Sequence, residues 1–180
     1  MIALLIILPA CLILLIIEKL GVRTTLELQF KGDVKRETRW LAQYGQSVCT
    51  PLAGILIWQL DVAHRKEAVA MVVTVFAVSI VAMLLKRLLG RVRPGREGAG
   101  KFLGPTFRHA NWRESFPSSH SACAMCLSGF LAHLYPQAAI TFWTLAILCA
   151  GLRYILDAHW PSDVLAGSAL GIAAAMVVSG

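Results

Sequence analysis

The run RYILDAHWPSD, residues 153–163, stands where one long apolar segment ends and the next begins. Charged and titratable side chains are costly near lipid, so their presence at such a junction indicates a functional site. Arg153 and His159 are six residues apart and would face different directions on one continuous helix. The run therefore predicts a helix that ends just before His159 and a turn that holds this histidine. A second helix is predicted to begin at Pro161 and to carry Asp163 in its first turn.

The rest of the chain has the composition of a membrane protein. Hydrophobic residues make up 57% of the 180 residues, and the mean hydropathy is +0.67, which is too apolar for an ordinary soluble domain. Six apolar segments approach the roughly 17 to 25 residues that a helix needs to cross a bilayer. They are residues 2–17, 40–60, 68–85, 117–134, 138–156 and 162–178. Because backbone polar groups in lipid must be satisfied within the segment, the predicted fold class is all-α. We expect one integral-membrane domain over residues 1–180, a polytopic six-transmembrane-helix bundle with both termini on one side.

The basic charge and the cysteines do not point to nucleic acid or metal chemistry. The formal net charge is +7, but the sequence has no nucleic-acid recognition motif and no basic run interleaved with aromatic residues. We therefore expect the lipid bilayer and a lipid phosphate as partners, and no nucleic acid. Cys123 and Cys126 form a C-x-x-C inside an apolar segment without a second ligand pair, which favours buried small residues.

The predicted topology gathers three polar clusters. In a six-helix bundle, the connections after the first, third and fifth helices share one face. The clusters at these connections are residues 86–94, 117–120 and 153–163. They are therefore expected to converge at one depth. His64 and His133 fall on the opposite face, and His109 belongs to no matched spacing, so these histidines are assigned no role.

The clusters contain the residues needed to hold and transfer a phosphoryl group. Lys86 and Arg93 are seven residues apart and would share a helical face about two turns apart. Pro117 fits the first turn of a helix, which would leave the amides of the next three residues free for an anion. Each residue alone has a structural explanation, such as a snorkelling Lys86. Their joint arrival on one face favours a site. A His–His–Asp zinc site is the competing interpretation, although three cations around it would repel the metal.

The spacing of these residues resembles the type 2 phosphatidic acid phosphatase superfamily, whose pattern is K-x6-RP, then PSGH, then SR-x5-H-x3-D. The present sequence reads Lys86-x6-Arg93-Pro94, Pro117-Ser118-Ser119-His120 and Arg153-x5-His159-x3-Asp163, and the resemblance covers roughly residues 45–178. Ser119 replaces the glycine of the pattern but still supplies its amide. Leu152 replaces the serine of the pattern and removes a hydroxyl that would assist phosphate binding. We therefore expect an effect on rate or preference rather than on reaction type.

The resemblance implies a type 2 phosphatidic acid phosphatase-like core and a role for each matched residue. His159 would be the nucleophile that forms a phosphohistidine, and Asp163 would fix its tautomer. His120 would protonate the leaving group and then activate water. The phosphate oxygens would be held by cations and by the start of a helix. This phosphate-binding set is Lys86, Arg93, Ser118, Ser119 and Arg153. No metal and no other cofactor is expected.

The expected function is a membrane-embedded, metal-independent phosphatase that hydrolyses a lipid phosphate or diphosphate. Candidate substrates are undecaprenyl diphosphate, phosphatidylglycerophosphate, phosphatidic acid and the 1-phosphate of lipid A. Two alternatives stay open: phosphotransfer between lipids, and a catalytically silent protein that binds or carries a lipid phosphate. The presence of both His120 and His159 disfavours the second alternative, because binding alone does not need two histidines.

The membrane orientation is predicted differently by two arguments. Of the 17 Lys and Arg residues, all but Arg65 and Lys66 are assigned to the face that bears the motifs. The positive-inside rule would place that face in the cytoplasm. The resemblance implies the opposite, a multi-pass protein of the bacterial inner membrane whose site faces the periplasm, and we adopt this expectation.

Two connecting segments are expected to shape the substrate path. Residues 95–104 are glycine-rich and basic, which is typical of a mobile flap and equally of a plain loop. Residues 22–46 mix apolar and basic side chains, which suits an interfacial helix on anionic lipid or a solvated connector.

Overall fold

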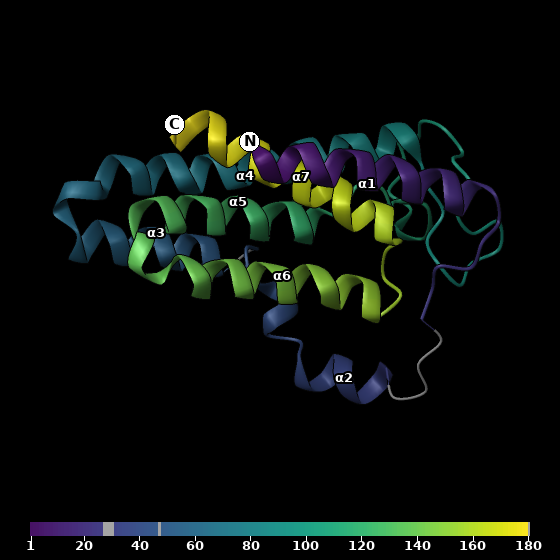
Figure 1. The fold of residues 1–180 in the computed structure, drawn as a ribbon, viewed down its shortest axis with the longest axis horizontal. Coiled ribbons are helices and arrows are strands. Elements are labelled where there is room, and N and C mark those ends of the chain that lie inside the picture. The colour runs from purple at the N-terminus through teal and green to yellow at the C-terminus, as the bar shows by residue number, and fades with distance from the viewer. Residues whose placement is uncertain (27–30, 47, 180) are drawn as a thin grey trace.

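The computed structural model describes residues 1–26, 31–46 and 48–179. Regular structure in these residues is helical, apart from one isolated bridge between Arg91 and Phe102. The longer helices of this part run side by side along one axis (Figure 1). They are α1 (Ile2–Lys19), α3 (Cys49–Leu60), α4 (Arg65–Leu89), α5 (Ser119–Leu134), α6 (Ala139–Ile155) and α7 (Pro161–Ser179). The predicted all-α bundle is confirmed.

Not all of these helices have the full length of a membrane span. Within the described residues, four stretches are long and apolar enough to cross a bilayer. They are Ile2–Lys19, Val62–Leu89, Pro136–Ile155 and Pro161–Ser179. Helix α5 has 16 residues and α3 has 12, so the predicted count of six crossings is approximate. The amino group of Met1 lies 3.7 Å from the Met176 sulfur, which agrees with termini on one side.

Two predicted helix starts are wrong, and both errors have a local cause. The expected helix over residues 40–60 begins only at Cys49, after a short 3-10 turn at Leu41–Gln43. Gly45 interrupts it with φ +84°, and a Cβ at this position would lie 2.5 Å from the Ala124 amide nitrogen. The expected helix over residues 117–134 begins at Ser119, because Ser118 has an extended backbone (ψ 109°) and acts as the N-cap, accepting from the Ser121 amide. Pro117 therefore precedes the helix instead of lying in its first turn.

Helix α5 forms the centre of the bundle, and most residues between 121 and 131 are buried. Its closest neighbour is α7, which approaches through glycine. A Cβ on Gly167 would lie 2.2 Å from the Ser118 carbonyl oxygen, and a Cβ on Gly171 would lie 2.1 Å from the Ala122 carbonyl oxygen. Small residues at such crossings let two membrane helices touch backbone to backbone. This contact places the first turns of α5 and α7 next to each other.

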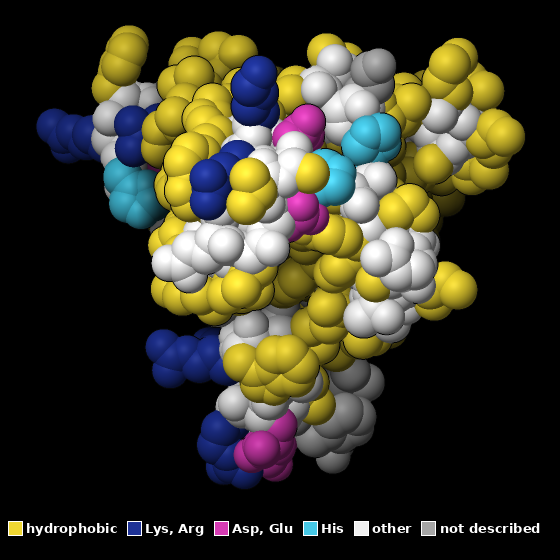
Figure 2. Space-filling model, turned by 90° about the vertical axis from the view of Figure 1, so that its left-hand side faces the viewer, with side chains coloured by type: hydrophobic (Ala, Val, Ile, Leu, Met, Phe, Trp, Pro, Cys, Tyr) yellow, Lys and Arg dark blue, Asp and Glu magenta, His cyan; other side chains and the backbone are white. Residues whose placement is uncertain are grey.

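The opposite end of the bundle carries little charge. Figure 2 views this end, where the α3–α4 and α5–α6 connections expose a few charged and histidine side chains among hydrophobic ones. At this end the Tyr135 hydroxyl donates to Asp61 at 2.9 Å, and Asp61 also contacts His64 at 2.7 Å. These contacts join the α3–α4 connection to Tyr135 at the end of α5, which is consistent with assigning His64 no catalytic role.

The connector after α1 contains one short helix, α2 (Lys31–Glu37), which stands off the bundle (Figure 1). The interfacial helix expected over residues 22–46 is therefore limited to these seven residues and the following turn. Residues 27–30 of that segment lie outside the described part of the chain.

Candidate active site

The structure brings the three polar clusters together at the end of the bundle away from the termini (Figure 1). Hydrogen bonds join the segments directly. The Ser118 amide donates to the Asp163 carbonyl oxygen at 2.9 Å, and the Arg93 guanidinium donates to the Ala158 carbonyl oxygen at 2.9 Å. Residues 65 positions apart in sequence therefore form one site.

His159 lies in the turn between α6 and α7, as the spacing predicted. Helix α6 ends at Ile155, and Asp157 follows with φ +49°. The His159 side chain is 1% exposed. Its Nδ1 atom lies 3.6 Å from Asp163 Oδ2, and its Nε2 atom is buried without a hydrogen-bond partner among the described residues. The ring thus turns one nitrogen toward a carboxylate and leaves the other free to react.

Burial keeps the His159 ring neutral. Desolvation is the main cause that lowers its pKa from 6.5 to about 3, with the Lys86 and Arg93 charges acting in the same direction and Asp163 opposing them. A neutral imidazole has a lone pair available for attack on phosphorus. The 3.6 Å contact is long for a hydrogen bond, but such contacts in unliganded sites often tighten when substrate binds.

Asp163, in the first turn of α7, is held by donors on both oxygens. Oδ1 accepts from Arg91 Nη1 at 2.6 Å. Oδ2 accepts from the Trp160 amide at 2.9 Å and from the Ser115 hydroxyl. The carboxylate is fully buried. Its orientation is therefore fixed before any substrate arrives, which is what a residue that orients a histidine requires.

His120 lies at the start of α5, but the surrounding amides differ from the prediction. Ser118 is the N-cap, and its hydroxyl accepts from the Ser121 amide at 3.4 Å. The Ser118 amide is already bonded to Asp163, so the prediction that it is free for an anion is wrong. The amides of Ser119 and His120 occupy the first helical turn, where a helix has no internal acceptor for them. The helical backbone at Ser119 accepts a side chain without strain.

Three cations surround this centre. Lys86 is in the last turn of α4 and is 8% exposed, and Arg153 is in the last turn of α6. Within the described residues, Arg153 Nε is buried without a hydrogen-bond partner. The charges of Lys86, Arg93 and Arg153 lie close enough to disfavour one another. A bound phosphate would relieve this repulsion.

Arg93 has an additional structural function. Its Nε donates to the Asn111 carbonyl oxygen at 2.7 Å and its Nη2 to the Glu114 carbonyl oxygen at 3.3 Å. Together with the bond to Ala158, these contacts fasten the loop after α4 to the turn that holds His159. Arg93 therefore positions two site segments as well as bringing a positive charge.

The Leu152 side chain faces away from the site. It is 6% exposed and belongs to a small core cluster with Leu41 and Ala42. The residue that departs from the superfamily pattern thus packs α6 against the turn before α3, in a place where a serine would bring a hydroxyl.

Three residues near the His–Asp pair do not follow from the sequence alone: Arg91, Glu18 and Ser115. Arg91 contacts both Asp163 and Glu18, while Ser115 Oγ lies 3.5 Å from His159 Nδ1. The available signal was that Glu18 directly follows the first apolar segment, residues 2–17, and that Arg91 lies between Lys86 and Arg93 in a matched motif. No spacing rule connects residues 73 positions apart.

A cavity of about 830 Å³ opens beside Arg93. Its wall includes Arg96, Lys101 and Asn111, so the glycine-rich residues 95–104 border the mouth of the site. The function of this segment as a flap rather than a plain loop stays a prediction.

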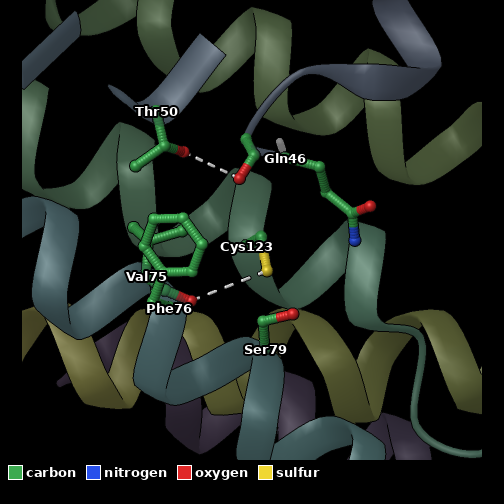
Figure 3. Close-up of a pocket in the computed structure, with 7 residues that line it drawn as sticks. Gln46, Thr50, Val75, Phe76, Ser79 and Cys123 are labelled. Atoms are coloured by element: carbon green, nitrogen blue, oxygen red, sulfur yellow. Dashed lines mark hydrogen bonds between the residues drawn. The ribbon is translucent and has the colours of Figure 1, made fainter. Parts of the chain in front are cut away.

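A smaller cavity of about 100 Å³ lies deeper in the bundle (Figure 3). It is lined by Gly45, Gln46, Thr50, Val75, Phe76, Ser79 and Cys123. Ser79 precedes Lys86 by seven residues on α4, and Cys123 follows His120 by three on α5, so this cavity lies one to two helical turns below the site. Cys123 and Cys126 are buried and free, and the Cys123 thiol faces the Val75 carbonyl oxygen at 3.9 Å.

The described residues contain no group of three or more His, Cys, Asp or Glu side chains that could hold a metal ion. The zinc interpretation would need His120, His159 and Asp163 to form such a group. In this geometry the Asp163 oxygens are occupied by Arg91, Ser115 and Trp160.

The fold and the site define an integral membrane protein with a buried His–Asp pair under a cluster of cations. A family model described as the PAP2 superfamily matches residues 67–179. The chain belongs to this superfamily.

Curated relatives carry names from the same chemistry. The chain is 38% identical over 99 residues to "Lipid A 1-phosphatase" of Rhizobium johnstonii, which covers 54% of this chain and 41% of the relative. It is 40% identical over 100 residues to "Lipid A 1-phosphatase" of Rhizobium etli, and this match covers 54% of the present chain and 43% of the relative. It is 27% identical over 124 residues to "Putative undecaprenyl-diphosphatase YbjG" of Escherichia coli, and this match covers 68% of the present chain and 61% of the relative. The matches thus span less than half the length of the two Rhizobium proteins. No solved structure gives a significant match.

Proposed function

We propose that this protein is a membrane phosphatase that hydrolyses a lipid phosphate or diphosphate through a phosphohistidine on His159. The observation that carries this proposal is the placement of His159. Its Nδ1 faces Asp163 while its buried Nε2 has no partner among the described residues. Around it lie Lys86, Arg93 and Arg153, whose positive charges disfavour one another. This arrangement supplies a neutral nucleophile and a place for an anion next to each other.

The reaction then proceeds in two steps. His159 Nε2 attacks phosphorus, a P–N bond forms, and the bond from phosphorus to the leaving oxygen breaks while His120 donates a proton to that oxygen. Asp163 stabilises the positive charge that develops on the His159 ring. In the second step His120 accepts a proton from water, the water oxygen attacks phosphorus, and the P–N bond breaks. Lys86, Arg93 and Arg153 hold the equatorial oxygens in both steps, the task that a metal ion performs in other phosphoryl-transfer enzymes.

The names of the relatives narrow the substrate class. The Rhizobium proteins are named for the 1-phosphate of lipid A and the E. coli protein for undecaprenyl diphosphate. Both substrates are lipids whose phosphate group lies at the membrane surface. The site of this chain lies at one end of a bundle of apolar helices, which supports a substrate whose phosphate lies at the membrane surface. We therefore propose these two lipids as the first substrates to test, with phosphatidylglycerophosphate and phosphatidic acid beside them.

Purified protein in detergent is expected to release inorganic phosphate from at least one of these four lipids in the presence of excess EDTA. The reason is that protein cations, rather than a metal ion, hold the phosphate. The measurement is phosphate release with and without the chelator. Activity that disappears in EDTA and returns with a divalent metal would overturn the metal-free mechanism. Product that carries the phosphate on a second lipid would show transfer rather than hydrolysis.

We also propose that the active-site end faces the periplasm of the bacterial inner membrane. The excess of Lys and Arg at this end argues for the cytoplasm, but several of these charges are used inside the fold. The guanidinium groups of Arg91, Arg93 and Arg113 are bonded to carboxylates or carbonyl oxygens. They therefore bind loops and helices together instead of facing a membrane surface.

The orientation predicts the labelling of Arg108→Cys, at an exposed position of the loop after α4. Four of the native cysteines are buried and one is half-buried, so the background is low. A maleimide that cannot cross membranes is expected to label this variant in intact spheroplasts, and Arg65→Cys at the other end only after permeabilisation. The reverse pattern would place the site in the cytoplasm.

A further inference from the structure

A buried chain of alternating charges runs from the first helix to the catalytic pair. Arg91 Nη2 lies 2.7 Å from Glu18 Oε2, and Arg91 Nη1 lies 2.6 Å from Asp163 Oδ1. None of the three side chains is more than 2% exposed. Glu18 is on α1, outside the residues 67–179 that match the family model. The site therefore receives a carboxylate from a part of the chain to which the comparison assigns nothing.

We propose that Glu18, acting through Arg91, is a positioning residue that orients Asp163 and keeps the cluster facing His159 negative. The proposal rests on the proposed function of His159 as the nucleophile. Glu18 does not touch the substrate, and its effect reaches the ring through two ion pairs.

The contacts of Glu18 extend to the first turn of α7. Its carboxylate accepts from the Ser162 amide at 3.3 Å and from the Ser162 hydroxyl. Arg91 Nη1 also donates to Ser162 Oγ at 2.7 Å. Glu18 and Arg91 thus both form hydrogen bonds with Ser162, the residue that immediately precedes Asp163. A shift of either side chain would move the carboxylate that faces the ring.

The surroundings of Arg91 strengthen these contacts. The guanidinium carbon lies 5.1 Å from the centre of the Phe102 ring and 5.4 Å from that of the Trp160 ring. These aromatic rings exclude water, so the charges of the chain act on each other through a low local dielectric.

The charge of Glu18 has a specific consequence for the reaction. Glu18, Arg91 and Asp163 together carry one negative charge, and the His159 ring becomes positive when Nε2 bonds to phosphorus. The negative cluster stabilises that ring. Without the Glu18 charge, Arg91 would be balanced by Asp163 alone, and the cluster facing His159 would be neutral. The first chemical step would then be slower, although phosphate binding at Lys86 and Arg153 would not change.

Cys11 offers a matched control that separates an effect of the Glu18 charge from a purely structural effect. This residue is also on α1, is 6% exposed, and donates from its thiol to the Ser162 carbonyl oxygen at 3.4 Å. It joins α1 to the same residue of α7 as Glu18 does, but without a charge. Cys11→Ala therefore loosens the helix contact alone.

The test compares Glu18→Gln, which keeps the shape of the side chain, with Cys11→Ala and wild type in steady-state phosphate release. Glu18→Gln is expected to lower kcat about 10- to 100-fold, the range found when a partner behind a reacting group is removed. Its KM is expected to stay within about threefold, because the transition state and not substrate binding is affected. Cys11→Ala is expected to keep both values. Thermal midpoints show whether all three proteins are folded.

A second measurement does not depend on activity. The ¹⁵N shifts of the His159 ring are expected to show the proton on Nδ1 in wild type and a mixture of tautomers in Glu18→Gln. Wild-type kcat in folded Glu18→Gln, or an equal loss in Cys11→Ala, would overturn the proposal while leaving the phosphatase function intact. If the wild type releases no phosphate from any lipid, the proposed function fails, and an unchanged tautomer in Glu18→Gln would overturn the positioning role as well.

Discussion

Replacing His159 with alanine is expected to abolish phosphate release, with a loss of kcat of about 10⁴-fold or more, as for other enzymes that lose a covalent nucleophile. The structure gives the reason, because His159 Nε2 is buried and unpartnered within the described residues and lies under the site cations. No other described histidine except His120 shares this environment. The measurement is phosphate release from the best lipid substrate at saturating concentration.

The control for this change is His133→Ala, which removes a histidine from the far end of α5. This variant is expected to keep wild-type activity. Both variants can be compared by gel filtration and thermal melting in the same detergent. A folded His159→Ala protein with activity within tenfold of wild type would exclude this residue as the nucleophile, and a carrier function predicts lipid binding without any turnover by the wild type.

Replacing His120 with alanine is expected to slow hydrolysis of a lipid phosphate by about 10² to 10⁴-fold, the usual contribution of a general acid–base residue. The effect should depend on the leaving group. A lipid alkoxide needs a proton as it departs, whereas 4-nitrophenolate does not. With 4-nitrophenyl phosphate, the His120→Ala protein is therefore expected to form the phosphoenzyme normally and to hydrolyse it slowly.

The measurement is a burst of 4-nitrophenolate, about one per enzyme, followed by slow turnover. Wild type is expected to show a smaller burst or none, because its second step is assisted. Equal loss of the burst and of the steady rate in His120→Ala would contradict a function of His120 limited to proton transfer.

The geometry around His159 was predictable because it depends on short-range spacing. Arg153 and His159 are six positions apart and cannot share one helical face, and Pro161 begins a helix readily. The break and the turn therefore followed from the sequence. The convergence of the three clusters followed from the alternation of loops in a helical bundle. These rules need only the local chain and the membrane.

The parts that could not be predicted depend on packing between distant segments. Gly45 breaks the expected helix because α5 passes within contact distance of its backbone. The Ser118 amide is not free because α7 brings the Asp163 carbonyl oxygen to it. The pairing of Glu18 with Arg91 requires α1 to pack against α7 and the loop after α4. Hydropathy places these helices in the membrane but does not determine which faces meet.

At Leu152, where the chain departs from the superfamily pattern, the sequence and the packing give different information. The sequence alone indicates a lost hydroxyl beside Arg153, while the structure shows that the side chain packs with Leu41 and Ala42. Position 152 therefore contributes to holding α6 in place, and Arg153 is oriented by that helix toward the site.

The most direct test of the account is to identify the phosphorylated residue. The His120→Ala protein can be incubated with 4-nitrophenyl phosphate, quenched in alkali, which preserves phosphohistidine, and digested with trypsin. His159 is the only histidine after Arg153, and no Lys or Arg follows Arg153, so one peptide reports on this residue alone. One added phosphoryl group is expected on that peptide, and it is expected to be absent from the His120→Ala/His159→Ala double variant. A phosphoryl group on another peptide, or turnover without any phosphorylated peptide, would contradict it.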